Sequence, residues 1–261
     1  MNRWFFVAFF FFLTPLWCLS ASDISFIPAS SVVQGDPVLI LLSAPPSLVS
    51  QVVIQDNRVA FFPYQEHTAV LYGVDIHAPI GIRTVRVTFT DHTVATSTFS
   101  IIARDRYQAP LPIPDSLGGN TPDNDSRVVS LLARENAILS RLKTGAKKFW
   151  TEPFRYPLAS VFVVDPYGYD RTTGRYAIVH KGTDFRASVG TPVFAPNRGV
   201  VRVARSFTVY GKTVVIDHGL GVQTFLMHLS RISVVPGQLV RAGQRIGLSG
   251  ESGYATGPHL H

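Results

Sequence analysis

The first part of the chain, residues 22–105, alternates short apolar runs with turn residues. The segment 83–89 is the clearest, because Val85, Val87 and Phe89 would share one face of a strand. Glycine, proline, Asp and Asn separate the runs, for example at Gly35 and Gly81. Strands are predicted at residues 31–33, 37–42, 52–54, 59–62, 69–74, 84–90 and 93–103. Many short strands at this spacing predict an immunoglobulin-like β domain, folded as a sandwich, over residues 22–105.

Residues 106–148 change character twice and predict a linker followed by a helix. Positions 107–124 are rich in Pro, Gly, Asp and Asn, as in a linker. Side chains at 124–126 are the expected N-cap, and Gly145 is the expected C-cap. Between them apolar residues recur every three or four positions, at Val128, Leu131, Leu132, Ile138, Leu139 and Leu142. We expect this stripe to pack on a neighbouring domain.

From residue 149 onward the pattern returns to β. Predicted strands cover residues 160–164, 192–195, 199–204, 212–217, 222–229, 239–240 and 245–248, with Gly and Pro in the gaps between them. The fold class is therefore mainly β, with one connecting helix and a second β domain at 149–261.

The N-terminus has the pattern of a secretory signal peptide over residues 1–21. Arg3 precedes a short apolar stretch at 4–17, and small residues for cleavage follow at 20–21. Cys18 is the only cysteine, so cleavage would leave no thiol for a disulfide. We expect an exported protein with no stable membrane span after signal cleavage. An uncleaved anchor stays open as an alternative.

The chain is basic, with 24 Lys and Arg against 17 Asp and Glu. The basic residues are scattered and are typical of a soluble basic surface. The alternative is attraction to a polyanion such as an anionic cell wall. We find no nucleic-acid-binding motif and expect no nucleic-acid partner.

Candidate chemistry is concentrated in the last third of the chain, in four histidines and one carboxylate: His180, Asp184, His228, His259 and His261. Three such donors with an open fourth position form the ligand set of a catalytic zinc ion, and the other two histidines would carry protons. A turn at Gly182 would bring the first two together, and a strand after Pro258 would orient the last two. The remaining histidines, His67, His77, His92 and His218, are interpreted as surface or structural residues.

The segments 180–185, 190–193, 216–219, 227–230 and 256–261 (HKGTDF, GTPV, IDHG, MHLS and TGPHLH) resemble motifs of the lysostaphin/LytM-type zinc metalloendopeptidases, in the order of that family. The resemblance covers about residues 154–261. The N-terminal region is similar to immunoglobulin-like domains that precede the catalytic domain in exported relatives.

The resemblance implies an antiparallel β peptidase domain that binds one Zn²⁺ through His180, Asp184 and His261. His228 and His259 would flank the open position, with the division of roles between them left open. The implied activity is hydrolysis of peptide bonds in cross-links or stems of peptidoglycan, in the periplasm or cell envelope of a bacterium. The alternatives are a catalytically silent wall-binding protein, an activator of other wall hydrolases, or a peptidase that cuts secreted proteins.

Two departures from the family pattern affect these expectations. Phe225 stands where many relatives carry a tyrosine, and the sequence stops at His261, where relatives continue. We expect the sequence to be a fragment of a longer chain, truncated at its C-terminus. We also expect the linker or the helix to occlude the cleft, because the oxygen-bearing residues at 123–125 could compete for zinc.

Overall fold

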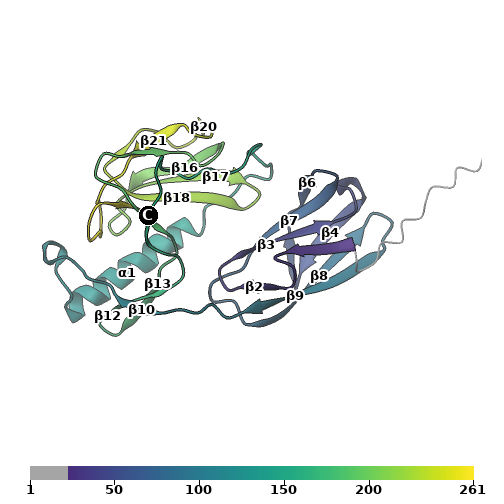
Figure 1. Cartoon of the computed structure of the whole chain (residues 1–261), viewed down its shortest axis with the longest axis horizontal. Coiled ribbons are helices and arrows are strands. Elements are labelled where there is room, and N and C mark those ends of the chain that lie inside the picture. The colour runs from purple at the N-terminus through teal and green to yellow at the C-terminus, as the bar shows by residue number, and fades with distance from the viewer. Residues whose placement is uncertain (1–22) are drawn as a thin grey trace, which may run out of the picture.

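A computed structural model describes residues 23–261, so the predicted signal segment at 1–21 lies outside the described residues. The chain forms an N-terminal sandwich and a C-terminal β region, with helix α1 lying along the C-terminal region (Figure 1). Within residues 23–261, no helix is long and apolar enough to cross a bilayer.

The N-terminal sandwich consists of a four-stranded sheet in the order β1-β3-β7-β6 and a five-stranded sheet in the order β2-β9-β8-β4-β5. This order corresponds to that of immunoglobulin domains and is consistent with the predicted type. The strand bounds are β1 (Ile24–Ile27), β2 (Ser31–Val33), β3 (Pro37–Leu42), β4 (Val49–Ile54), β5 (Asn57–Val59), β6 (Phe62–Tyr64), β7 (His67–Gly73), β8 (Gly81–Phe89) and β9 (Val94–Ile102). A single 3₁₀ turn, η2 (Pro46–Leu48), precedes β4.

Alternation along the strands builds the core between the two sheets. Val85, Val87 and Phe89 of β8 are buried on one face, which confirms the pattern predicted for this segment. The predicted strand at 59–62 is wrong, because the chain leaves the five-stranded sheet after β5 and enters the other sheet at β6. Gly81, predicted as a turn, instead begins β8 with φ of 123°.

The predicted linker contains a strand of its own. β10 (Gln108–Pro110) pairs in parallel with β12 (Asp170–Thr173), and β12 pairs antiparallel with β13 (Tyr176–Val179). A 3₁₀ turn, η3 (Asp115–Leu117), lies between β10 and α1. Part of the linker is therefore an edge strand of a sheet in the C-terminal region.

Helix α1 spans Pro122–Leu139, and both of its predicted ends are wrong. Thr121 is the N-cap, with its side chain accepting from the Asn124 amide, and Pro122 occupies the first turn. At the other end Ser140 is the C-cap. Gly145 cannot cap the helix, because its N–H donates to Asp217 Oδ2 at 2.9 Å.

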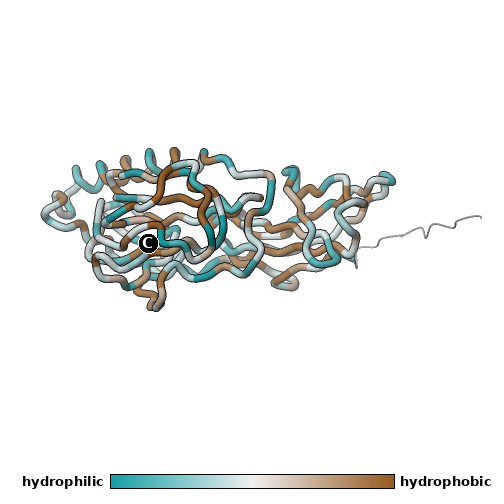
Figure 2. Tube along the Cα trace, turned by 90° about the horizontal axis from the view of Figure 1, so that it is seen from above, coloured by the Kyte–Doolittle hydropathy of each residue, from teal (hydrophilic) through white to brown (hydrophobic). Residues whose placement is uncertain are grey.

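The C-terminal region is made of several small sheets. The largest has the order β18-β17-β16-β20, and three-stranded sheets have the orders β15-β21-β19, β11-β14-β22 and β10-β12-β13. The bounds not yet given are β11 (Val163–Asp165), β14 (Asp184–Arg186), β15 (Pro192–Phe194), β16 (Gly199–Ser206), β17 (Lys212–Gly219), β18 (Val222–Leu229), β19 (Arg231–Ile232), β20 (Leu239–Val240), β21 (Arg245–Leu248) and β22 (His259–Leu260). Apolar stretches run through the interior of both regions (Figure 2).

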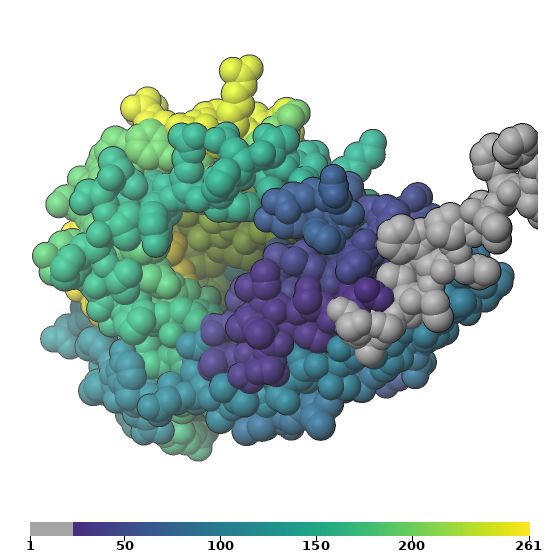
Figure 3. Space-filling view, turned by 45° about the vertical axis from the view of Figure 1, so that its right-hand side comes forward, coloured from purple at the N-terminus to yellow at the C-terminus, as the bar shows by residue number. Residues whose placement is uncertain are grey.

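The two regions touch one another directly. Arg104, just after β9, pairs with Asp36 and lies over the ring of Tyr167, with 5.1 Å from its guanidinium carbon to the ring centroid. Phe62 and Trp150 meet edge to face at 5.9 Å between ring centroids. A hollow opens between the two regions on one face of the molecule, with residues late in the chain in its floor (Figure 3).

Asp217 of β17 ties the segment after α1 to the central sheet. Its buried carboxylate accepts hydrogen bonds from Thr144 Oγ1, the Gly145 and Gly219 amides and the Arg202 guanidinium. Burial alone would raise the pKa of Asp217, but the hydrogen bonds from Thr144 and Arg202 hold it below its usual value.

We predict that Asp217→Asn lowers the free energy of unfolding by about 3 kcal/mol at pH 7, because an amide turns a donor toward groups that all donate. Since the folded-state pKa is depressed, this contribution is present above the unfolded-state value of about 3.9 and is lost as pH falls through the folded-state pKa. Chemical denaturation of both proteins from pH 7 down to about pH 3 measures the difference, which should narrow below about pH 4. Asp56→Asn, at an exposed turn, is the matched control and should change stability little. Equal stabilities at pH 7 would contradict this role of Asp217.

Candidate functional site

Three chain segments bring His180, Asp184 and His261 together. His180 follows β13, Asp184 begins β14, and His261 follows β22, which pairs antiparallel with β14. The chain bends at Gly182, as expected. A Cβ at Gly182 would lie 2.3 Å from Nε2 of His261, so a larger residue there would displace the imidazole.

The donor atoms of these three residues converge on one point. Nε2 of His180 lies 3.2 Å from Asp184 Oδ1 and 3.2 Å from Nδ1 of His261, and the last two atoms are 2.6 Å apart. A tetrahedral zinc ion with bonds near 2.0 Å separates its ligand atoms by about 3.3 Å. Two imidazole nitrogens and one carboxylate oxygen at this spacing fit a divalent metal of the zinc type.

Protonation at the cluster follows from its surroundings. Nδ1 of His180 lies 2.8 Å from the Pro166 carbonyl, which can only accept, so Nδ1 donates to this carbonyl and Nε2 faces the cluster. Burial pushes the pKa of Asp184 upward, but hydrogen bonding to His180 and His261 outweighs it and holds the pKa far below its usual range. Burial lowers the pKa of His261. The cluster therefore combines a carboxylate with a neutral imidazole at His261.

His228 and His259 lie beside the cluster. Their ring centroids are 4.7 Å apart, that of His228 is 6.0 Å from that of His261, and Nε2 of His259 is 3.8 Å from Asp184 Oδ1. Each uses Nδ1 to contact a backbone carbonyl at 2.8 Å, Ser252 for His228 and Gly257 for His259. In the neutral form of either ring, Nδ1 is therefore the protonated nitrogen and Nε2 the acceptor.

The backbone of His228 departs from a regular strand. Its φ is 57°, and the β17–β18 register shifts in the same stretch. The strand predicted over residues 222–229 is therefore irregular at this residue. Burial and the neighbouring His259 lower the pKa of His228 to about 3, so its imidazole is neutral at physiological pH.

The sequence interpretation missed several residues around the cluster. Arg171 of β12 donates to Asp184 Oδ2, and Tyr169 packs edge to face on His180 at 5.4 Å between ring centroids. Tyr210 lies with its ring centroid 6.4 Å from that of His261. No sequence pattern singled them out, because their partners come from distant segments.

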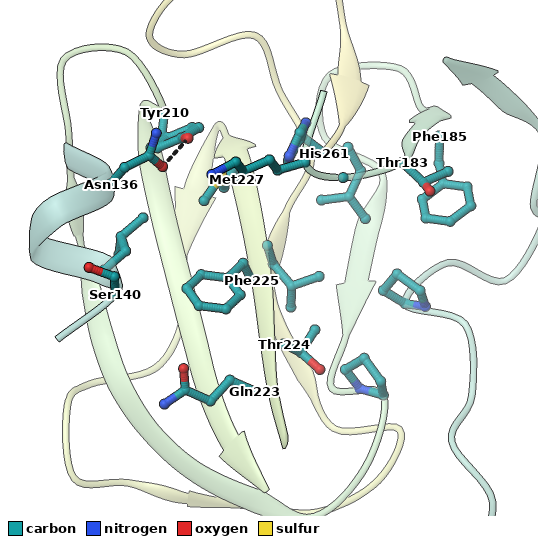
Figure 4. A pocket seen from close by; sticks show the side chains of 17 residues that line it. Asn136, Ser140, Thr183, Phe185, Tyr210, Gln223, Thr224, Phe225, Met227 and His261 are labelled. Atoms are coloured by element: carbon teal, nitrogen blue, oxygen red, sulfur yellow. Dashed lines mark hydrogen bonds between the residues drawn. The ribbon is translucent and has the colours of Figure 1, made fainter. Parts of the chain in front are cut away.

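Helix α1 is hydrogen-bonded to the loop that carries Tyr210. Glu135 is buried and accepts from the backbone amides of Thr208, Val209 and Tyr210. The Tyr210 hydroxyl donates to Asn136 Oδ1 at 2.7 Å (Figure 4). Burial and the Glu135 carboxylate raise the pKa of Tyr210 to about 12. The helix is thus fastened to the rim of the site.

Cavities open on two sides of His261. One of about 610 Å³ lies between the end of α1 and β18, with Phe225 and Met227 along its wall (Figure 4). A second of about 320 Å³ lies between α1, the segment 111–114 and β13 and reaches His180 and His228. α1 therefore borders the space around the cluster.

The expectation that residues 123–125 compete for zinc, and so occlude the cleft, is wrong. Asn124 donates to the Leu117 and Gly119 carbonyls, and Asp125 accepts from Thr173, so both are engaged away from the cluster. Asp123 is exposed at the start of α1.

The four other described histidines do not join the cluster. His218 is buried, with contacts to the Arg198 carbonyl and the Thr224 hydroxyl at 2.8 and 2.9 Å, as expected for a structural residue. His77 and His92 are exposed and His67 is half-buried, all in the N-terminal sandwich.

Known proteins resemble this chain in sequence and in fold. The peptidoglycan DD-endopeptidase ShyA of Vibrio cholerae is 47% identical over 111 residues, which are 41% of this chain and 26% of ShyA. ShyB of the same organism, also named a peptidoglycan DD-endopeptidase, is 30% identical over 247 residues, which are 82% of this chain and 57% of ShyB. A Pseudomonas aeruginosa structure described as a peptidase M23 is similar in fold, with a TM-score of 0.54 over 88% of this chain and 87% of that one, at 24% identity.

The chain thus spans about a quarter of the length of ShyA and 57% of that of ShyB. Residues 178–261 match peptidase family M23 and include all five residues of the cluster and its flanks. The C-terminal region of this chain is therefore a peptidase M23 domain of the lysostaphin/LytM type.

Proposed function

We propose that this protein is an exported zinc endopeptidase that hydrolyses peptide bonds in peptidoglycan cross-links or stems. One observation carries the proposal: two buried donors and a half-buried one meet at a single point, with two more imidazoles beside them and a cavity adjoining. A protein that only binds the cell wall would not need this arrangement. Each buried polar group costs free energy unless hydrogen-bond partners or a metal ion satisfy it.

In this proposal His180, Asp184 and His261 hold the metal through Nε2, Oδ1 and Nδ1. Zinc, when bound there, supplies a Lewis acid that polarises an amide carbonyl and acidifies water. The protein fixes the donor atoms beforehand, since the Pro166 carbonyl orients His180 and the β14–β22 pairing places Asp184 near His261.

His228 and His259 are the proposed proton carriers. Both are oriented through Nδ1, so the Nε2 atom of each neutral ring is placed to accept a proton from an attacking water and to return it to the leaving amine. After taking a proton, either ring becomes a donor that stabilises a developing oxyanion.

The relatives support the proposed substrate class. ShyA and ShyB are named peptidoglycan DD-endopeptidases, and the first is 47% identical to this chain over 111 residues. The predicted signal segment and the net charge of +7 suit export to an anionic envelope, and we place the protein in the periplasm or at the cell envelope of a bacterium.

We predict that His261→Ala abolishes stoichiometric zinc binding and lowers the release of new amino termini from purified peptidoglycan by about 10³-fold or more. Metal content and amino-terminus release are measured on the same preparation. The control is His92→Asn, at an exposed position with φ of 69°, where Asn tolerates the left-handed backbone. Zinc-loaded wild-type protein that releases no amino termini would instead support a wall-binding or activating role.

We further predict that His228→Asn and His259→Ala each retain one zinc ion but lower kcat by about 10²- to 10⁴-fold, because they remove a proton carrier and not a ligand. Asparagine is chosen at His228 because φ there is 57°. Steady-state kinetics at saturating zinc, together with metal analysis, separates the two effects. Loss of zinc from either variant would place that histidine in the ligand set.

A further inference from the structure

A half-buried guanidinium, that of Arg171, lies beside the metal cluster. Arg171 Nη2 donates to Asp184 Oδ2 at 2.5 Å and to Asp165 Oδ2 at 2.9 Å, and its Nε donates to the Tyr169 hydroxyl at 2.7 Å. The Arg171 side chain is 20% exposed. Three directed hydrogen bonds hold the planar group in one orientation.

The two carboxylate oxygens of Asp184 therefore have different partners. Oδ1 faces His180 and His261, whereas Oδ2 is occupied by Arg171. A carboxylate held in this way offers one oxygen to a metal and cannot rotate to offer both.

The position of Arg171 is itself set by the segment before α1. Arg171 pairs with Ala109 in the β10–β12 ladder. Tyr107, just before β10, stacks on Tyr169 with 4.7 Å between ring centroids and 4° between planes. Tyr169 in turn touches both Arg171 and His180, so one aromatic ring supports two parts of the site.

We propose that Arg171 is a positioning residue that presents Asp184 to the metal through Oδ1 alone, and that Tyr169, braced by Tyr107, fixes the guanidinium. The proposal deepens the proposed function and rests on its metal site. Its decisive readout is metal binding, which is measured without hydrolysis.

Charge and orientation predict opposite effects on zinc affinity when Arg171 is replaced. Removing a cation beside a ligand carboxylate would by charge alone strengthen the binding of a divalent ion. Losing the group that orients a ligand weakens metal binding, typically by about 10- to 100-fold. We expect orientation to prevail, because the charge of Arg171 is already shared with Asp165.

The test compares Arg171→Gln, Arg171→Lys and Tyr169→Phe with the wild-type chain. Zinc Kd is measured by chelator competition, Co²⁺ absorption reports the ligand geometry, and thermal unfolding of the metal-free proteins reports the fold. We expect zinc Kd to rise by about 10- to 100-fold in Arg171→Gln and by less in the other two, with an altered Co²⁺ spectrum. Lysine keeps the charge but cannot satisfy three acceptors in one plane. The matched control is Arg175→Gln, an exposed arginine on the same hairpin that stacks on Tyr176.

Unchanged or tighter zinc binding in Arg171→Gln, with a wild-type Co²⁺ spectrum, would overturn the proposal. So would a loss of metal-free stability with no change in zinc Kd, which indicates a purely structural role. If Arg171→Gln does not fold, Arg171→Lys and Tyr169→Phe decide, and zinc Kd values equal to that of Arg175→Gln overturn it. A wild-type chain that binds zinc but cuts no peptidoglycan would contradict the proposed function and leave this test valid.

Discussion

The site depends on one buried carboxylate that is shared between two kinds of partner. Asp184 is nearly inaccessible to solvent, and an isolated charge there would be too costly to keep. It is ionised because two imidazoles face one oxygen and a guanidinium faces the other. Each of these partners comes from a different stretch of the chain, so the carboxylate joins β12, β13, β14 and β22 at one point.

The segment between the two β regions is bonded to the C-terminal region that carries the metal cluster. β10 extends the sheet that carries Arg171, and α1 fastens the loop of Tyr210 through Glu135. The backbone amide of His228 donates to the Tyr210 carbonyl. Hydrogen bonds therefore link α1 to the flanking histidine through the loop of Tyr210. A helix expected only to cover or connect is thus part of the wall of the site.

Local patterns in the sequence predict the elements with strong alternation or distinctive chemistry. The strand predicted at 222–229 has the observed bounds of β18, and the histidine and aspartate motifs are sufficient to single out the five residues of the cluster and its flanks. The missed elements are short and polar, such as β12 with the sequence DRTT, and they exist only because a distant strand pairs with them. Arg171 escapes sequence-based prediction for the same reason, since its partner Asp184 becomes a neighbour only after folding. The end of α1 is misplaced because the helix already stops at Leu139, whereas Gly145 lies further along and is held by Asp217, a partner that no local rule contains.

The stacked pair of Tyr107 and Tyr169 also determines where the protein can be divided. A boundary at residue 149, which composition suggests, would discard β10, α1 and the ring that supports Tyr169. A boundary that keeps these elements together lies between Ile102 and Tyr107, in the short stretch that contains Arg104. A chain in which the sandwich is exchanged for another module at this boundary would keep the C-terminal unit whole, provided that the incoming module supplies partners for Tyr167 and Trp150.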